Sequence, residues 1–233
     1  MKTRLLSWLV CTLISVMALA QSDVTKFLGI PVDGSVDTMA RKLEAKGFKR
    51  EYPYDESRSN FFIGKYDGDN NAEIILFSNR DGIVYQIRVV KEEKIFNANL
   101  AKYKYNSLIR RFNEKWTYYN LYGSEIPEEE DIAEKFREGE SSYSAFFIQL
   151  PDSLLKAGKA LYDADNKPNT EKTLNELSKS IFKLRTLRTL EGKLDEAKNK
   201  GVVIYLKQYD ITKNYLILID YWNGYNDHRD EDL

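Results

Sequence analysis

The stretch NYLILIDYW, residues 214–222, decides the fold that this sequence predicts. Leu216 to Ile219 is apolar without alternation, and GVVIYLKQY at 201–209 is nearly so. Successive side chains of a strand point to opposite faces of its sheet, so an unbroken apolar run indicates a strand with cover on both faces. The stretch DITK joins the two runs. The sequence therefore predicts a C-terminal hairpin of two well-covered strands.

Further strands are predicted at NFFIGKY (60–66), AEIILF (72–77), IVYQIRVV (83–90) and SYSAFFIQL (142–150). The first three form a meander, because the turn-forming stretches DGDNN and SNRDG separate them. The strand at 83–90 alternates between an apolar set of side chains and a more polar set that includes Gln86 and Arg88. This period of two predicts one face on a core and a more polar face turned outward.

The first helix is predicted within FLGIPVDGSVDTMARKLEAKGF, residues 27–48. Ser35 is a favourable N-cap, and Gly47 fits the position just beyond the helix, from which Phe48 can fold back on Leu43. The free N–H groups at the start of this helix could also hold an anion. PVDG lacks the several glycines and the following lysine of a phosphate-binding loop, so helix capping is the favoured interpretation.

A second helix is predicted at 97–117, with a broad apolar stripe that comprises Leu100, Tyr105, Leu108, Ile109, Phe112 and Trp116. SEIPEEEDIAEKF at 124–136 predicts a third, short helix. Pro127 suits its first position, and the acidic run from Glu128 to Asp131 suits the positive end of its dipole.

Residues 152–200 have a different character, with leucines at helical spacing around Leu174, Leu177, Ile181 and Leu184. The spacing then slips, which excludes a sustained coiled coil and predicts a bend or a break. We expect this block to be a helical insertion that covers the second face of the C-terminal hairpin. The predicted fold class is α+β: an antiparallel sheet of about six or seven strands with an N-terminal helix, a second packing helix and this insertion.

Residues 1–20 predict a cleaved Sec signal peptide. Lys2 and Arg4 precede an uncharged apolar stretch, and ALA at 18–20 provides small residues before the cleavage point. Cys11, the only cysteine, lies inside this stretch and does not fit a lipid-anchor site. We therefore expect an exported protein, periplasmic or secreted, with residues 21–233 forming a single domain and no transmembrane span. Neither an internal repeat nor a long linker is evident in the sequence.

The charge of the mature chain excludes an obvious polyanion partner. The sequence has 35 basic and 36 acidic residues, and removing Lys2 and Arg4 leaves 33 against 36, a net charge of −3 with histidine neutral. Nothing therefore predicts binding to nucleic acid or to an anionic membrane.

Motifs for catalysis and metal binding are missing from the sequence. His228 is the only histidine and lies in a polar tail, and the mature chain has no cysteine, so a zinc site, a histidine-based triad and a thiol nucleophile are not expected. The alternating oxygen ligands Asp67, Asp69, Asn71 and Glu73 are superficially similar to a calcium loop. The EF-hand requires glycine at position six and glutamate at position twelve, where this chain has Ala72 and Ser78. A hairpin turn is the favoured interpretation.

Two further acidic groups also have structural interpretations. Glu128 to Asp131 suit a helix start, and the tail residues Asp227, Asp230, Glu231 and Asp232 suit a solvated terminus. The sequence therefore nominates no catalytic, cofactor-binding or metal-binding residue, and it predicts no cofactor.

The sequences at both ends of the chain are similar to those of a known group of proteins. FLGIPVDGSVDTMARKLEAKGF and the tail YNDHRDEDL resemble a group of uncharacterised exported proteins of Gram-negative gut-type bacteria, which open with FLGIPVDG…GF and end in YN…EDL. The resemblance covers about the first hundred and the last twenty residues and implies no function. The helix followed by a meander also looks like periplasmic α+β modules of the outer-membrane assembly lipoprotein and β-lactamase-inhibitor type, an analogy of fold alone.

Three functions remain open. The sequence favours an exported, non-catalytic binding or interaction module for a protein, peptide or glycan. A carboxylate-dependent hydrolase acting on glycan and a structural accessory of an envelope assembly are the alternatives, so enzymatic activity is not excluded. A cleft with two facing carboxylates would favour the hydrolase, because glycosidases use such a pair. A sheet face or groove lined by Tyr and Phe would favour the binding module.

Overall fold

A computed structural model describes residues 24–51, 60–91, 95–115, 117–149, 200–209 and 214–227. Several predictions made from the sequence lie outside these residues. They are the signal peptide, the helical insertion at 152–200 apart from its last residue, the connection DITK, Trp116, and the tail from His228 onward.

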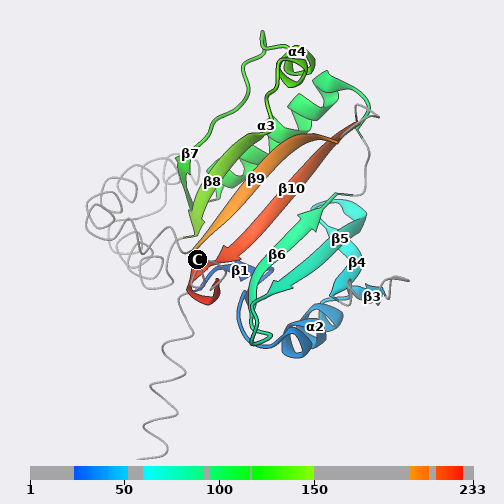
Figure 1. The fold of residues 1–233 in the computed structure, drawn as a ribbon, viewed down its shortest axis with the longest axis vertical. Helices are drawn as coiled ribbons and strands as arrows, with labels where there is room; N and C mark the ends of the chain where they lie inside the picture. Colours follow the sequence, from blue (N-terminus) through cyan, green and yellow to red (C-terminus); the bar gives the residue numbers. More distant parts are fainter. Residues whose placement is uncertain are drawn as a thin grey trace, which may run out of the picture.

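The protein has an α+β fold with a large antiparallel sheet (Figure 1). Its eight strands are β3 (Lys49–Glu51), β4 (Phe61–Tyr66), β5 (Asp69–Ser78), β6 (Val84–Val90), β7 (Tyr118–Tyr122), β8 (Tyr143–Gln149), β9 (Lys200–Tyr209) and β10 (Asn214–Asn223). They are ordered β3-β4-β5-β6-β10-β9-β8-β7. A small hairpin of β1 (Lys26–Phe27) and β2 (Ile30–Pro31) precedes them, and a short 3-10 helix, η3 (Gly224–Asn226), follows.

The connectivity repeats itself within the sheet. Among the described residues, helix α2 (Val36–Ala45) is followed by the four strands β3 to β6, and helix α3 (Ala98–Glu114) by the four strands β7 to β10, with a further short helix between β7 and β8. The two meanders meet where β6 pairs antiparallel with β10. This is the connectivity that a two-fold axis through the β6–β10 pair would generate, although the sequence itself shows no repeat.

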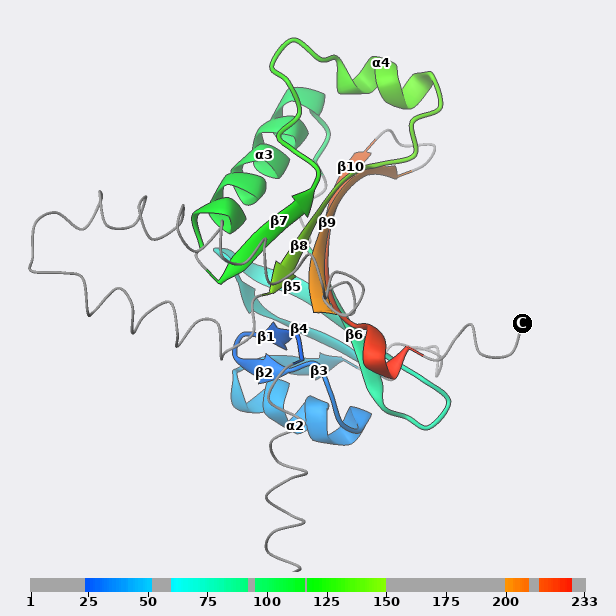
Figure 2. The ribbon, with the colours of Figure 1, turned by 90° about the vertical axis from the view of Figure 1, so that its left-hand side faces the viewer.

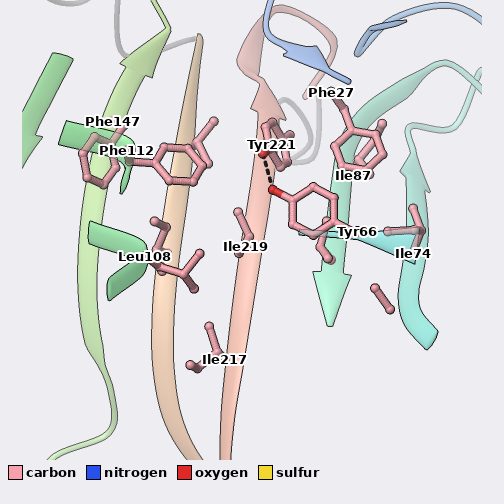
Figure 3. Close-up of a cluster of buried hydrophobic side chains, with 14 of the residues drawn as sticks. Phe27, Tyr66, Ile74, Ile87, Leu108, Phe112, Phe147, Ile217, Ile219 and Tyr221 are labelled. Carbon is pink, nitrogen blue, oxygen red and sulfur yellow. Dashed lines mark hydrogen bonds between the residues drawn. The ribbon is translucent and has the colours of Figure 1, made fainter. Parts of the chain in front are cut away.

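The hydrophobic core lies between the helices and one face of this sheet (Figures 2 and 3). Helices α2, α3 and α4 (Ile132–Arg137) all bury residues in one cluster with the inward side chains of the central strands. On β10 these are Tyr215, Ile217, Ile219 and Tyr221. The hydroxyl groups of Tyr66 and Tyr221 lie 2.7 Å apart within the cluster, which satisfies two polar groups that burial removes from water.

Both caps predicted for the first helix are confirmed. The side chain of Ser35 accepts a hydrogen bond from the backbone N–H of Thr38. Gly47 has a φ of +92°, and the N–H of Phe48 donates to the carbonyl oxygen of Leu43 at 3.1 Å. This closes the C-terminal turn in the way expected of a glycine just beyond a helix, and Phe48 is buried as a result.

Two predictions, about a turn and about the second helix, are corrected. The turn predicted over DGDNN is only two residues long, Asp67 and Gly68, and β5 begins at Asp69. Both turn residues have positive φ, as a tight two-residue hairpin turn requires, so Asp69 and Asn71 belong to a strand. Leu100, predicted to lie on the broad apolar stripe of the second helix, is 42% exposed.

The third helix is much shorter than predicted. It begins after Asp131, which is its N-cap, so Pro127 does not occupy its first position. The ammonium group of Lys102 donates to the carbonyl oxygens of Pro127, Glu128 and Glu130 at 3.2, 2.6 and 2.8 Å. These carbonyl groups have a tertiary partner, which favours the non-helical path.

Candidate functional site

The candidate site is the face of the large sheet opposite the helices, which we call the open face. Register pairs define its middle row as Phe61, Ile75, Arg88, Asp220, Val203 and Phe146. One flanking row consists of Phe77, Gln86, Trp222, Gly201, Ile148 and Tyr119. The other consists of Ile63, Glu73, Val90, Leu218, Tyr205 and Ser144.

Aromatic and aliphatic side chains dominate the open face. Phe61, Phe77, Tyr119, Tyr205 and Trp222 are each only partly buried. The described helices bury their apolar residues in the core on the opposite face, and none of them packs on this one. A contiguous apolar surface of this kind marks an interaction site more often than an ordinary exterior.

An ion pair occupies the centre of this face, at the junction of the two meanders. Arg88 of β6 and Asp220 of β10 are direct register partners. The guanidinium donates two hydrogen bonds to the two carboxylate oxygens, from Nε and Nη2, each at 2.7 Å. The side chain of Asp220 is 7% exposed and that of Arg88 is 32% exposed. The hydrogen bonds to Asp220 hold the pKa of Arg88 above its ordinary value.

Side chains of the open face shield one another. The Arg88 guanidinium lies over the ring of Phe77, 5.3 Å from its centre. Tyr122 stacks on Phe146, with 5.6 Å between the ring centres. Gly201 makes room for that aromatic pair, because a Cβ atom there would lie 2.2 Å from the Phe146 ring. Phe146 and Ile148 are only 5% and 2% exposed, so the β8 part of this face is buried, while aromatic rings on its other strands remain partly exposed.

Burial on this face corrects the expectation for Gln86. The alternation in 83–90 predicts an outward polar side chain, yet Gln86 is only 9% exposed. Phe77 and Trp222 flank it in register on the two neighbouring strands. Large neighbours cover a residue that its own strand pattern leaves in solvent.

The acidic residues singled out in the sequence do not converge. Asp67 binds Lys91 and Arg111, while Glu73 lies on the open face. Asp131 caps α4, and Asp227 accepts from the Trp222 indole at 3.3 Å. Among the described residues no three His, Cys, Asp or Glu side chains are grouped closely enough to hold a metal ion. No helix in this part of the chain combines the length and the apolarity that a bilayer crossing needs.

A second feature of the molecule is a cavity of about 130 Å³ between α3 and the ends of β6 and β10. Lys91, Lys104 and Arg111 line it, although they lie up to twenty positions apart in the sequence. Sequence reasoning missed this cluster, because only the packing of α3 on the sheet brings Lys91 beside the helix. The spacing of Lys104 and Arg111, seven residues apart on one helix face, was the only local signal.

Comparison with known proteins finds no relative: no family model, no curated protein and no solved structure matches the chain. The resemblance of its two ends to uncharacterised exported proteins therefore stays a prediction.

Proposed function

We propose that this chain is an exported, non-catalytic binding module, periplasmic or secreted, that holds a protein partner against the open face. The observation that carries the proposal is the continuous row from Phe61 to Phe146, apolar except for one paired charge. The cores of protein interfaces have this composition, rich in aromatic residues and arginine and poor in unpaired charge. Export rests on the N-terminal sequence alone.

The chemistry of the face favours an apolar protein segment over a glycan. Aliphatic side chains such as Ile63, Ile75 and Val203 lie between the aromatic rings. A sugar needs hydrogen-bond partners for its hydroxyl groups, since unpaired polar groups are costly at a dry surface. The central polar groups, Arg88 and Asp220, already pair with each other.

Nothing in the described structure specifically favours the hydrolase alternative. Asp220 is the buried carboxylate of the open face, and both of its oxygens accept hydrogen bonds from Arg88. A general acid or base must be within reach of the proton that it transfers, with its oxygen available to the substrate. The pairing assigns Asp220 a structural role at the junction of the two meanders.

Site-specific photo-crosslinking tests the proposal. A benzoylphenylalanine would replace Tyr119 or Tyr122 on the open face, and Arg41 on α2 as the matched control, in protein expressed in its own host. Arg41 is exposed and lies on a helix that packs against the other face. We expect the same protein adduct from both open-face positions and none from Arg41.

A variant of the face itself sharpens the result. Ile75→Ser should abolish the adduct while leaving the far-ultraviolet circular dichroism spectrum unchanged, because Ile75 is only partly buried. Equal adducts from Arg41, or none from the open face, would overturn the proposal. A glycan adduct would show that the partner is of a different class.

A further inference from the structure

The outward side of helix α3 carries an exposed apolar stripe, which we call the α3 stripe. It consists of Phe96, Leu100 and Tyr103, which are 76%, 42% and 63% exposed. Leu100, Tyr103 and Ser107 are spaced by three and four residues, so they follow one side of the helix, and Phe96 lies just before its N-cap. Clustered apolar side chains of this kind, unlike single ones, indicate a docking surface.

The segment beside this stripe, residues 124–140, is strongly acidic, and we call it the acidic segment. It has two basic residues against eight acidic ones, a net charge of −6, whereas the whole chain has a net charge of −1. Most of the negative charge in the sequence that lacks a compensating neighbour is therefore concentrated here. The carboxylates belong to Glu125, Glu128, Glu129, Glu130, Asp131, Glu134, Glu138 and Glu140.

The fold neutralises only part of this charge. Ion pairs within the described part of the chain involve two of the eight carboxylates, those of Glu125 and Glu138. Glu128, Glu129 and Glu134 are exposed and have no such partner there. Like charges that repel one another raise the free energy of the folded state, and a bound cationic group would lower it.

Tyr143 experiences the negative potential of the acidic segment. Its hydroxyl donates a hydrogen bond to a carboxylate oxygen of Glu130. Burial is the main cause that raises the pKa of Tyr143, and the hydrogen bond to Glu130 and the charges of Glu140 and Asp131 raise it further. Because a negative potential disfavours the phenolate, the direction of these contributions agrees with an excess of negative charge at this place.

The acidic segment is fixed to the side of α3 that adjoins the stripe, and Figure 2 shows α4 beside α3. The Lys102 ammonium group donates to three backbone carbonyl oxygens of residues 127–130. The side chain of Asn106 exchanges two hydrogen bonds with the backbone of Ile126, at 2.8 and 2.9 Å. Tyr103 follows Lys102 directly and lies three residues before Asn106, so it marks the border between the stripe and the segment.

This anchoring leaves acidic side chains available to a partner. Lys102 is nearly buried and binds carbonyl oxygens, so it does not neutralise the carboxylates of Glu128 and Glu129. A surface whose backbone is already fixed loses little conformational entropy when a partner binds. The α3 stripe and the acidic segment therefore form one preorganised surface, apolar on one side and anionic on the other.

We propose that this surface docks a basic amphipathic helix of a partner protein. Apolar side chains that repeat every three or four residues on that helix would pack along the α3 stripe. Lysine or arginine side chains on its flank would pair with Glu128, Glu129 and Glu134. The surface lies on the outer side of a helix that covers the core, away from the open face, so the proposal goes beyond the proposed function and is independent of it.

A second copy of this chain fits the surface less well. Arg110 and Arg111, the cations exposed on the C-terminal half of α3, already pair with Glu125 and Asp67. An antiparallel α3 of a second copy would therefore bring few unpaired positive charges to the acidic segment. Charge complementarity favours a basic partner.

Titration of the full chain with labelled peptides, followed by fluorescence anisotropy, tests the proposal. The probe is a peptide of leucine and lysine, roughly 15 residues long so that it can form a helix, with leucines every three or four residues. A scrambled peptide of the same composition and a peptide with glutamate in place of lysine are the controls. We expect the probe to bind at least about tenfold more tightly than either control, and more weakly as salt screens the charges. Equal binding of the scrambled peptide, or no binding of the probe, would overturn the proposal.

A variant of the α3 stripe locates the apolar half of the surface. Leu100→Ser should weaken binding of the probe about tenfold, as for the loss of one apolar anchor. Leu28→Ser is the matched control, because Leu28 is 43% exposed and lies in the turn between β1 and β2. Both side chains are exposed, so both variants should fold. Equal affinities of the two variants would show that the probe binds elsewhere and would overturn the proposal.

A charge variant locates the anionic half. Replacing Glu128, Glu129 and Glu134 together by glutamine should weaken binding of the probe at low salt about tenfold or more and reduce its dependence on salt. The control removes the same number of exposed carboxylates from α2 and β3, by Asp37→Asn, Glu44→Gln and Glu51→Gln. The same loss in both triple variants would reduce the effect to net charge and would overturn the assignment to the acidic segment.

The oligomeric state distinguishes the partner from a second copy. Sedimentation equilibrium should show the same state for the wild type and for Leu100→Ser. A dimer that Leu100→Ser dissociates would identify a second copy as the occupant of the α3 stripe and would overturn the proposal of a basic partner.

Discussion

The absence of a side chain at Gly64 decides how closely helix α2 approaches the sheet. Gly64 lies in β4 opposite the ring of Phe48, which the end of α2 folds back into the core. A Cβ atom at position 64 would lie 2.3 Å from Cδ1 of that ring, far inside van der Waals distance. The missing side chain at Gly64 is therefore what lets the capped helix close on the sheet.

Gly64→Ala should destabilise the protein by about 1–3 kcal/mol through overpacking. Without the clash, alanine in a strand interior would be expected to gain about 0.5–1 kcal/mol over glycine, so the sign of the change is informative. Urea unfolding measures it. Combining the change with Phe48→Leu should recover part of the loss, and a Gly64→Ala variant at least as stable as the wild type would contradict the packing argument.

Successive side chains on β10 test whether both faces of the sheet contribute to stability. Ile217 is 2% exposed and faces the core, whereas Leu218 is 7% exposed and lies on the open face. Truncating either to alanine should cost about 2–5 kcal/mol, as for other buried aliphatic residues. If Leu218→Ala changes the unfolding free energy by less than about 0.5 kcal/mol, as surface changes do, the open face contributes little.

The two central strands are the elements that join the two halves of the molecule. β6 and β10 are paired from Gln86–Trp222 to Val90–Leu218, and the Arg88–Asp220 pair lies in the middle of this register. An apolar pair could also stabilise this position. The charged pair, with its two directional hydrogen bonds, additionally disfavours a shift of register between the halves.

Removing Arg88 should cost more stability than removing Asp220. Arg88→Met leaves a nearly buried carboxylate without a partner, for which about 3–5 kcal/mol is expected. Asp220→Leu leaves a guanidinium that can still reach water, because Arg88 is partly exposed, and should cost less. The double variant should be close to wild type in urea unfolding. A double variant less stable than both single variants would show that the pair is essential to the junction.

At the scale of the whole molecule, buried tyrosines link stability to alkaline pH. Burial raises the pKa of Tyr118 to about 12, with hydrogen bonds to Gln149 and Tyr221 opposing the rise. Burial also raises the pKa values of Tyr66 and Tyr221 above their ordinary 10.0. Hydrogen bonds from these residues connect β4, β7, β8 and β10 across the core.

The sign of the pH dependence follows from these shifts. Above pH 10 the tyrosines of the unfolded chain lose phenolic protons that the folded protein retains. The contribution of these tyrosines to the free energy of unfolding is therefore fully present below pH 10 and falls as the pH rises toward 12. Each retained proton contributes a slope of about 1.4 kcal/mol per pH unit. Urea unfolding between pH 8 and 11.5 should show this fall, and Tyr118→Phe should make it shallower. The exposed Tyr209→Phe is the control, and a Tyr118→Phe slope as steep as wild type would contradict the assignment.

The sequence by itself determined the features that depend on neighbours along the chain. The caps of α2 at Ser35 and Gly47, the apolar run of β10 and the α+β class follow from local hydrogen bonding and side-chain periodicity. Local patterns failed where a distant partner competes, as Lys102 does for the carbonyl oxygens before α4. Strand β7 was not predicted, because its sequence, YYNLY, carries no clear alternation.

Only the tertiary structure decided which strands lie side by side, and therefore which side chains share the open face. In the strand order, the second meander runs in reverse beside the first, so that β6 pairs with β10. This pairing brings Arg88 to Asp220, 132 positions apart, and aligns the aromatic rows of the open face. It also brings Lys91 beside Lys104 and Arg111 around the cavity. Strand pairing depends on the register between distant segments, which hydrophobic periodicity within one segment does not specify. The open face and the cavity therefore first become visible in the assembled sheet.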